Sequence, residues 1–400
     1  MLVRNLFVRD ARVLREARSL VQAGHDVTVI ALGTSAMPRR EERDGIRVIR
    51  VPAGRLAGPT ILGAGSGGGD AAPRKARSRP PILVWLRDRL LGARMARAAA
   101  SISADVFHAH DLNTLEPARR AARRRGAALV FDAHELYTEL PGLGDGERRR
   151  WERLERALIR EADAVIVPSP SRGDVLVERY GIPTPVVVMN CPDRSPPPDP
   201  AAGPLAPLRR GGERLLVYAG GFIEGRGLEN LIRAVPLVDA TRLVMIGWGP
   251  VEPVLREIAR NDGVAERVTF LAPVDPDEVV PTIAGADVGL APYLPIGLNN
   301  ELAAPNKLFE YLHAGLAVAA SDVPDVRRVV EGLAVGELFD ASDPSSVAAA
   351  VRRLIADDRT LAACRERARA AADRYTWEAQ AAVLLRTYEE LAATVRTKVP

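Results

Sequence analysis

The stretch PNKLFEYLHAGLAVAAS at residues 305–321 decides how the second half of the chain is interpreted. It predicts a short helix that starts after a proline, turns at Gly315 and leads into an apolar strand. Unpaired N–H groups and the helix dipole favour an anion at such a helix start, and Lys307 adds a full positive charge there. Glu310 follows three residues later on the same face. These two side chains could bind a diphosphate and ribose hydroxyls, or they could be an ordinary Lys–Glu pair on an amphipathic helix.

Strands and helices alternate outward from this stretch in both directions. Apolar strands that alternate with amphipathic helices predict parallel sheets covered on both faces. The expected strands of the first half are LVRNL, HDVTVIAL, IRVIRVP, DVFHAH, AALVFDAHE and DAVIVPS, and those of the second half are RLLVYAG, TRLVMIG, RVTFLA, DVGLAPY and LAVAAS.

The pattern predicts an α/β chain with two doubly wound, Rossmann-like domains. The N-terminal domain is expected at 1–190, a Pro-rich linker at 191–212 and the C-terminal domain at 213–375. A last helix at 376–400 is expected to pack back toward the N-terminal domain. Residues 53–81, rich in Gly, Pro, Ser and Arg, predict a long mobile loop. Ligands bind beyond the carboxyl ends of strands in such sheets, so two facing domains would form a binding cleft.

Composition narrows the functional classes. Two cysteines at 191 and 364 exclude a disulfide framework, and no apolar run reaches the length of a membrane span or of a signal-peptide core. A cytoplasmic protein is therefore expected. Residues 1–190 hold 32 Lys+Arg against 22 Asp+Glu, whereas residues 191–400 hold 23 against 29. The basic half predicts an anionic partner, or only solvated surface arginines.

Several stretches together resemble glycosyltransferase family 4, the retaining enzymes of the GT-B fold. They occur in the family's order and spacing along nearly the whole chain. The stretches are DARVLREARSLVQAGHDVTVIAL, HAHDLNTL, LVFDAHELYTE, ADAVIVPS, VYAGG with GRGLENLI, LVMIGWGP, ERVTFLAPV, ADVGLAPY, PNKLFEYLHAGLAVAAS and YTWEAQAAVLLRTYEEL. The resemblance implies a hexosyltransferase that moves a sugar from a nucleotide-diphosphate donor to an acceptor hydroxyl, in cell-envelope glycan, polysaccharide or glycolipid synthesis.

The resemblance also implies donor-binding residues near residue 305. The family commonly carries two glutamates eight positions apart, and Glu310 matches the second, which contacts the nucleotide ribose. The first would fall at Leu302, which is a departure from the family. Neighbouring Asn299, Asn300 and Glu301 are the candidates to bind the donor sugar instead.

Two glycine-containing loops are expected to complete the donor site. The loop AGGFIEGRG contains Gly220 and Gly221, and Arg226 stands where the family often has a diphosphate-binding Lys. A surface arginine is the alternative for Arg226. The loop GWGP contains Gly247 and Gly249 and is expected to line the base pocket.

Polar residues that follow two strands of the first half are expected at the acceptor side. His134 matches a family position close to the reacting sugar, and Glu135 follows it. His110 and Asp111 follow the preceding strand and could bind acceptor hydroxyls. A polar strand-end cap is the alternative for His134, and a helix cap is the alternative for Asp111.

The loop after the first expected strand, NLFVRDAR, contains two more candidates. Asp10 and Arg12 should also face the acceptor. The resemblance assigns catalysis to His134, Arg226 and Lys307, with charge stabilisation of the leaving diphosphate as the main effect.

No metal and no cofactor are expected. Asp275 and Asp277 mimic an Asp-x-Asp metal motif but directly precede a helix, so Asp275 is interpreted as an N-cap. The spacing of the histidines fits no common zinc site. No nucleic-acid-binding module is visible. The expected partners are a nucleotide sugar, a glycan or lipid-linked acceptor and, through the basic amphipathic stretch ILVWLRDRLLGARMARA, the inner face of an anionic membrane.

Two other functions remain open at this stage. A sugar-nucleotide epimerase or hydrolase on the same fold would need no acceptor. A non-catalytic sugar-nucleotide-binding protein would explain the missing glutamate at Leu302.

Overall fold

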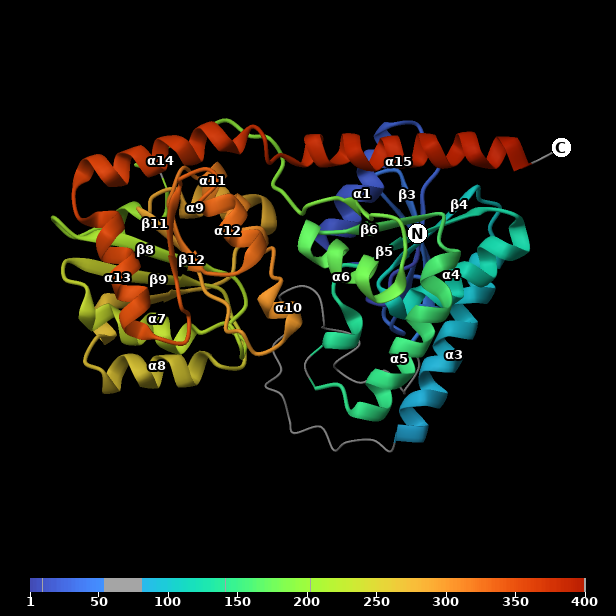
Figure 1. Cartoon of the computed structure of the whole chain (residues 1–400), viewed down its shortest axis with the longest axis horizontal. Coiled ribbons are helices and arrows are strands. Elements are labelled where there is room, and N and C mark those ends of the chain that lie inside the picture. Colours follow the sequence, from blue (N-terminus) through green and yellow to red (C-terminus); the bar gives the residue numbers. More distant parts are fainter. Residues whose placement is uncertain (9, 54–80, 141, 202, 399–400) are drawn as a thin grey trace. The chain divides into compact units, whose positions relative to one another are not determined.

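The chain forms two compact units in a computed structural model (Figure 1). The structure describes residues 1–8, 10–53, 81–140, 142–201 and 203–398. Unit 1 comprises Met1–Met189 and Gln380–Pro400, and unit 2 comprises Asn190–Ala379. Most of the loop expected at 53–81 lies outside the described residues. None of the helices in the described part of the chain has the length and apolar character needed to cross a membrane.

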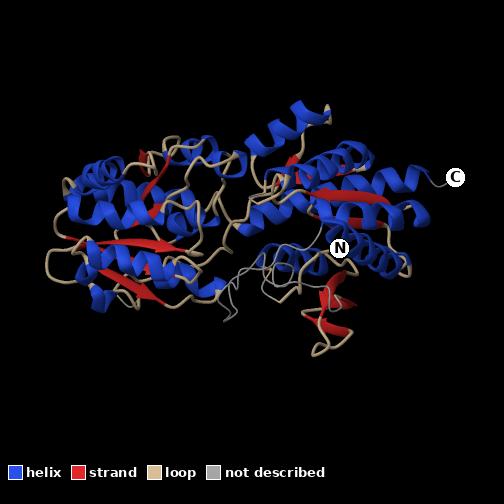
Figure 2. Cartoon of the chain, turned by 90° about the horizontal axis from the view of Figure 1, so that it is seen from below, coloured by secondary structure: helices blue, strands red, loops and turns tan. Residues whose placement is uncertain are grey.

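Unit 1 is built on a largely parallel sheet with helices packed against it (Figure 2). Its strands are β1 (Thr28–Gly33), β2 (Arg40–Arg43), β3 (Ile46–Pro52), β4 (Val106–His110), β5 (Ala128–Asp132), β6 (Ala164–Val167) and β7 (Val186–Val187). Its helices are α1 (Ala11–Gln22), α3 (Pro81–Ala100), α4 (Leu112–Arg125), η1 (Tyr137–Glu139), α5 (Asp145–Leu158), η2 (Ile159–Glu161), α6 (Pro170–Tyr180) and the greater part of α15 (Trp377–Lys398).

The strand order of unit 1 places its first segment in the middle of the sheet. The hydrogen-bonded groups are β1-β3-β2 and β4-β5-β6-β7, and β2 alone among the described strands is antiparallel to its neighbour. Leu2 joins the groups because it bridges in parallel to both Ile30 on β1 and Ala109 on β4. The strand expected at LVRNL is thus reduced to one bridged residue, which lies at the point where strand order reverses.

Unit 2 holds a six-stranded, fully parallel sheet in the order β10-β9-β8-β11-β12-β13. The strands are β8 (Arg214–Ala219), β9 (Thr241–Ile246), β10 (Val268–Leu271), β11 (Val288–Ala291), β12 (Ala317–Ser321) and β13 (Gly336–Phe339). The helices are η3 (Ala206–Leu208), α7 (Leu228–Ala234), η4 (Val235–Leu237), α8 (Glu252–Asn261), η5 (Ala265–Arg267), η6 (Pro276–Glu278), α9 (Val279–Ile283), α10 (Leu298–Glu301), α11 (Asn306–His313), α12 (Pro324–Val330), α13 (Pro344–Ile355) and α14 (Asp358–Ala372).

The order of this sheet, read in chain sequence, is 3-2-1-4-5-6, the doubly wound arrangement. Its switch point lies between β8 and β11, so the loops that follow these two strands diverge at the carboxyl edge. The strands are mostly apolar, as burial on both faces requires, and every residue of β9, β11 and β12 is buried. The predicted α/β fold with two Rossmann-like domains is confirmed.

Candidate active site

The polar residues of unit 2 gather at the carboxyl edge of its sheet, around Lys307. This side chain belongs to the first turn of α11 and is only 8% exposed. Its Nζ lies 4.8 Å from the ring centroid of Tyr218 on β8 and 5.5 Å from that of Tyr293, which follows β11. Burial alone would lower the pKa of Lys307, but the neighbouring Tyr218 and Tyr293 outweigh burial and the pKa is raised. Lys307 is therefore a charged ammonium at neutral pH.

Arg226 brings a second cation to the same point. It lies in the loop between β8 and α7, and its guanidinium carbon lies 4.2 Å from the ring centroid of Tyr293. Lys307 and Arg226 thus share one aromatic ring, an arrangement that cation–π attraction favours. Two neighbouring cations next to the N-terminus of an eight-residue helix create a strong local preference for an anion.

The glycines of the two predicted donor loops hold these loops against one another. A Cβ on Gly247 would lie 2.0 Å from the carbonyl oxygen of Gly220, and one on Gly249 would lie 2.1 Å from that of Phe222. The loops are also hydrogen-bonded, since Phe222 N–H donates to Trp248 O at 2.8 Å. The absence of side chains at both positions therefore allows a backbone contact that no larger residue permits.

Among the glycines of these two loops, Gly220 is the one that lies beside Lys307. A Cβ on Gly220 would lie 3.2 Å from Lys307 Nζ, and the φ of this residue is +144°. Gly221 accepts a hydrogen bond from Tyr218 Oη at 2.9 Å, so the loop is fastened to the aromatic ring below Lys307.

The segment that replaces the family's first glutamate forms the short helix α10. Asn300 does not extend into solvent: its Nδ2 donates to Gly225 O at 2.9 Å and to Leu294 O at 3.0 Å. It thereby ties the Arg226 loop to the segment after β11. Asn299 is buried, Glu301 is exposed and Leu302 is buried. Glu310, one helical turn after Lys307, is half-buried and acts electrostatically on it.

The polar residues of unit 1 gather around Asp132, the last residue of β5. Its Oδ2 lies 2.8 Å from His134 Nε2. Asp132 is fully buried, whereas the His134 side chain is 20% exposed. Burial opposes the charge of His134, but Asp132 and Asp111 outweigh burial and raise its pKa to about 10. His134 is therefore an imidazolium ion at neutral pH. Burial also opposes the charge of Asp132, but Arg12 and His134 hold the pKa of Asp132 well below the usual range.

Arg12 supports Asp132 from inside the unit. Its Nε and Nη2 donate to the two carboxylate oxygens at 3.1 and 2.9 Å, and its Nη1 donates to Val188 O at 2.7 Å. The residue is only 7% exposed. The structure therefore points Arg12 inward to the strand end, whereas the sequence placed it at the acceptor.

The remaining candidates of unit 1 lie around the same histidine. Asp10 caps α1 by accepting from Val13 N–H at 3.2 Å. His110 is buried, and its Nδ1 lies 3.1 Å from His134 Nε2. Glu135 pairs with Arg172 at 2.9 Å.

Asp111 occupies the N-cap position of α4 without a capping side-chain bond, and its φ is +63°, which is rare for a residue with a side chain. Burial raises its pKa to about 6. Strain at a non-glycine residue beside a charged histidine is typical of functional sites.

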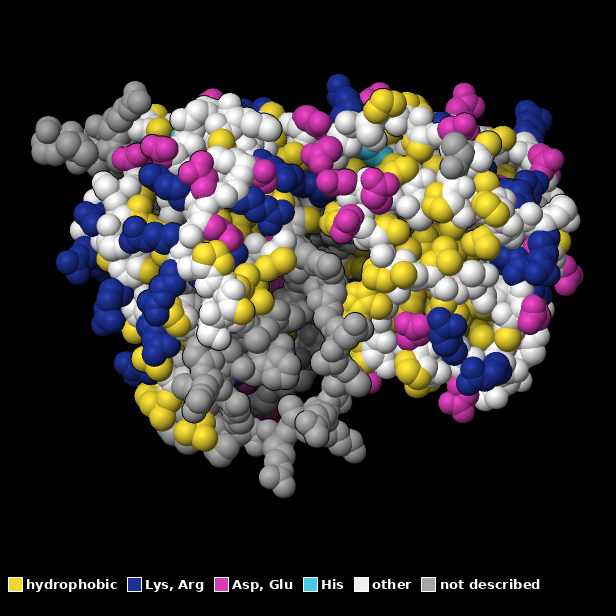
Figure 3. All heavy atoms as spheres, turned by 180° about the vertical axis from the view of Figure 1, so that it is seen from behind, with side chains coloured by type: hydrophobic (Ala, Val, Ile, Leu, Met, Phe, Trp, Pro, Cys, Tyr) yellow, Lys and Arg dark blue, Asp and Glu magenta, His cyan; other side chains and the backbone are white. Residues whose placement is uncertain are grey.

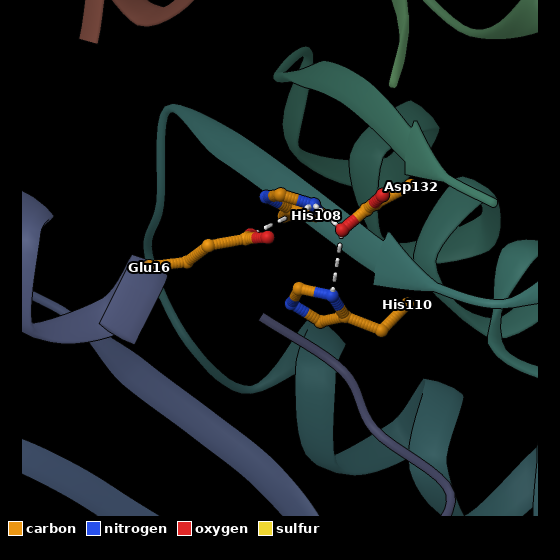
Figure 4. Close-up of side chains that lie close together, drawn as sticks. All are labelled: Glu16, His108, His110 and Asp132. Atoms are coloured by element: carbon orange, nitrogen blue, oxygen red, sulfur yellow. Dashed lines mark ion pairs between the residues drawn. The ribbon is translucent and has the colours of Figure 1, made fainter. Parts of the chain in front are cut away.

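Two residues of this cluster were not found from the sequence: Asp132 and Glu16. Glu16 belongs to α1, and burial raises its pKa well above the usual range. His108 lies two positions before His110 on the same face of β4, and its Nδ1 lies 2.8 Å from Tyr388 Oη on α15. Figure 4 shows Glu16, His108, His110 and Asp132 directed toward one another. A carboxylate two positions before a strand-end histidine was visible in the stretch FDAHE and could have indicated Asp132.

The remaining sequence expectation on metal ligands concerned Asp275. It occupies the N-cap position of η6, as expected, but its side chain makes no capping hydrogen bond.

Comparison with known proteins relates both units to one enzyme class. A family model described as "Glycosyl transferase 4-like domain" matches residues 10–192, and one described as "Glycosyl transferases group 1" matches residues 213–357. A glycogen synthase of Mycobacterium tuberculosis is 28% identical over 393 residues, which is 92% of this chain and 88% of the relative.

Solved structures share the fold. The sucrose-phosphate synthase of Thermosynechococcus elongatus has a TM-score of 0.75 at 20% identity and covers 96% of this chain and 93% of its own. HepE from Anabaena, solved with UDP-glucose, has a TM-score of 0.70 at 16% identity and covers 99% of this chain and 98% of its own. These likenesses confirm the GT-B fold. The chain belongs to the glycosyltransferases of the family 4 type.

Proposed function

We propose that this enzyme transfers a sugar from a nucleoside-diphosphate sugar to an acceptor hydroxyl with retention of anomeric configuration. The observation that carries the proposal is the pair Lys307 and Arg226, which converge over one tyrosine ring at the switch point of unit 2. Two cations and a helix N-terminus are complementary to a diphosphate. HepE, a structural neighbour, was solved with UDP-glucose, and UDP-glucose is of this donor class.

The chemical step is leaving-group departure. As the glycosidic C–O bond breaks, negative charge grows on the diphosphate oxygen, and Lys307 and Arg226 are fixed where they would stabilise that charge. They are held in place before the reaction, so no reorganisation is needed during it.

The proton of the acceptor hydroxyl goes to the leaving phosphate in this proposal. His134 has a pKa of about 10 and is already protonated at neutral pH, so it cannot serve as the general base. It would instead act as a hydrogen-bond donor. Attack on the same face from which the diphosphate departs gives retention.

A hydrolysis and transfer assay separates this function from its alternatives. Purified protein is incubated with a panel of nucleoside-diphosphate sugars, with and without glycan and lipid-linked acceptors. We expect slow release of the nucleoside diphosphate that accelerates with the correct acceptor and yields an α-linked product from an α-linked donor. Conversion of the donor that no acceptor accelerates and that yields no transfer product would indicate an epimerase or hydrolase, and binding without turnover would indicate a non-catalytic protein.

We further propose that the donor diphosphate is held without a divalent metal. Protein cations already meet its charge at Lys307 and Arg226. Calorimetric titration with UDP or GDP should therefore give the same affinity with and without Mg²⁺ or Mn²⁺. An affinity that rises tenfold or more with either ion would contradict this part of the proposal.

We also propose that unit 1 contacts an anionic membrane through α3, so that the acceptor is lipid-linked or delivered at the membrane. The second half of α3 is buried at Leu91, Met95 and Ala99, as a crossover helix requires. The first half differs, because Leu83, Leu86 and Leu90 are 49%, 49% and 42% exposed. Their spacing places them on one helix face, which is typical of an interfacial helix.

Basic side chains accompany this apolar face. Arg89 lies over the Trp85 ring at 4.9 Å, and Arg97 belongs to the last turn of the helix. Figure 3 shows hydrophobic and basic side chains mixed over the edge of unit 1 that holds α3. An aromatic ring with an arginine beside exposed leucines suits the interface between lipid headgroups and acyl chains.

A further inference from the structure

Four side chains of unit 1 converge behind His134 on one point in the interior (Figure 4). Glu16 comes from α1, His108 and His110 from β4, and Asp132 from β5. Each offers one potential ligand atom, and these atoms all lie within 4.8 Å of one another. All four residues are at most 2% exposed.

The closest approaches define the centre of the cluster. His108 Nε2 lies 3.8 Å from Glu16 Oε2 and 3.9 Å from Asp132 Oδ2. His110 Nδ1 lies 3.4 Å from Asp132 Oδ2. The two distances to His108 are too long for hydrogen bonds, the third is a long hydrogen bond, and all three are close to the separations of ligand atoms around a common ion.

Several of these buried atoms have no hydrogen-bond partner in the described part of the chain. They include both carboxylate oxygens of Glu16 and the Nε2 atoms of His108 and His110. Arg12 Nε lies 3.0 Å from Glu16 Oε1 as an ion pair, but the same guanidinium also binds Asp132. Burying a carboxylate is costly, and Arg12 is shared between Glu16 and Asp132, so a further positive charge between the four side chains would be stabilising. The two candidates are a proton shared by the carboxylates and a metal ion.

We propose that Glu16, His108, His110 and Asp132 bind one divalent transition-metal ion, with Zn²⁺ as the probe. Two imidazole nitrogens and two carboxylate oxygens are ligands that Zn²⁺ accepts, whereas Mg²⁺ and Ca²⁺ prefer oxygen alone. Tetrahedral ligand atoms about 2.0–2.1 Å from Zn²⁺ lie about 3.4 Å apart. The ion therefore needs to draw the most distant pair together by up to about 1.4 Å through side-chain rotation.

The surroundings of the cluster support metal ligation. Tyr388 Oη lies 2.8 Å from His108 Nδ1 and so directs the Nε2 atom of this histidine toward the carboxylates. Arg12 donates to both oxygens of Asp132. Metal-binding histidines and carboxylates characteristically have such outer partners. A cavity of about 560 Å³ at the amino-terminal edge of the sheet is lined in part by His108 and Tyr388, so it reaches one of the four side chains.

The inferred ion would join α1, β4 and β5 and fix Asp132, the residue that holds His134. It goes beyond the proposed function, because the donor diphosphate is assigned to residues of unit 2 only. The sequence predicted no metal site because no ligand pair has a common spacing along the chain. The proposal departs from that prediction because the sheet brings residues from three separate elements together.

Calorimetric titration of the full-length, chelator-treated protein with ZnCl₂ tests the site. We expect one ion per chain and a melting temperature that rises until one equivalent is added. Glu16→Gln and His108→Gln should each weaken Zn²⁺ binding at least tenfold. Glu178→Gln alters an exposed carboxylate of unit 1 outside the cluster and should leave Zn²⁺ binding unchanged. UDP affinity of all three variants should equal that of the parent protein, which separates this test from the proposed function.

Three outcomes would overturn the proposal. The first is an unmodified protein that binds no stoichiometric Zn²⁺, and the second is equal affinity in the parent and both cluster variants. If neither variant folds, Co²⁺ added to the unmodified protein decides, because tetrahedral nitrogen and oxygen ligation gives intense visible absorption bands. The third outcome is the absence of those bands, which would assign the cluster to a shared proton.

Discussion

At the scale of single residues, the molecule concentrates charge that is buried but balanced. Lys307 is 8% exposed and lies against two tyrosine rings, which keep its ammonium group charged inside the unit. Asp132 is fully buried and is balanced by Arg12 and His134. A buried charge is retained at such a cost when a ligand or a reaction uses it.

The first prediction concerns Lys307. Lys307→Ala should weaken binding of a nucleoside diphosphate by about 1.5–3 kcal/mol, because one charge-assisted hydrogen bond is lost. Isothermal titration calorimetry with UDP or GDP measures it. Lys307→Arg keeps the charge and should retain part of the affinity. Unchanged binding by Lys307→Ala would refute the assignment of this lysine to the diphosphate.

The second prediction concerns Asp132. Asp132→Asn leaves Arg12 and His134 without their counter-charge, so the free energy of unfolding should fall by about 3–5 kcal/mol. Urea denaturation measures this change. Asp26→Asn alters a carboxylate whose side chain is 97% exposed and should change stability little. A similar small effect in both variants would mean that Asp132 does not anchor the cluster.

At the scale of elements, the loops after β8 and β9 depend on one another. Their backbones touch at Gly220 and Gly247, and the first loop also carries Arg226. A residue of one loop can therefore shift a cation on the other.

Gly247→Ala tests this coupling. A Cβ 2.0 Å from Gly220 O forces the loops apart, so we expect a stability loss of about 1–3 kcal/mol and weaker UDP binding. Gly211→Ala is the matched control, because a Cβ there meets no atom within 4 Å. Denaturation and calorimetry measure both variants, and wild-type behaviour of Gly247→Ala would show that the loops do not depend on each other.

Helix α3 carries the fourth prediction. Replacing Leu83, Leu86 and Leu90 together by Gln should abolish sedimentation with anionic vesicles, because the exposed apolar face is lost. High salt should also reduce binding of the parent protein, since each nearby Arg adds about 1 kcal/mol of attraction. Val254→Gln, at an exposed valine of unit 2, is the control. Equal recovery of the parent protein with neutral and anionic vesicles at low salt would rule out membrane contact.

At the scale of the whole molecule, the chain crosses from unit 2 back to unit 1 at its end. Residues from Gln380 onward belong to unit 1. In this part of α15, Leu384, Tyr388 and Leu391 are buried. Unit 1 is therefore completed by the last segment of the chain, which also supplies the hydroxyl beside His108.

Leu384→Ala should lower the free energy of unfolding of unit 1 by about 2–5 kcal/mol, because the side chain is fully buried. Scanning calorimetry should show one transition shifted to lower temperature, while UDP binding by unit 2 persists at 25 °C. Leu237→Ala, at a leucine that is 43% exposed, should shift neither transition appreciably. Equal shifts of both transitions would mean that the units unfold as one.

The sequence by itself determined the features that depend on local pattern. The strand–helix alternation predicted both parallel sheets, and the stretch PNKLFEYLHAGLAVAAS predicted a helix start that carries Lys307. The order of the motifs was sufficient to identify the enzyme class. Hydrophobic periodicity and helix-start signals each involve residues that are close together in the sequence, so the sequence alone reveals them.

Only the tertiary structure decided which way several side chains point. Arg12 points inward, Asn300 binds backbone carbonyls of two loops, and Glu16 meets the two histidines of β4. The physical reason is that parallel strands adjacent in the sheet are separated in the chain by whole crossover helices. Pairing of β4 with β5, and of Leu2 with both β1 and β4, brings these groups within a few ångströms, and no spacing along the chain encodes that distance.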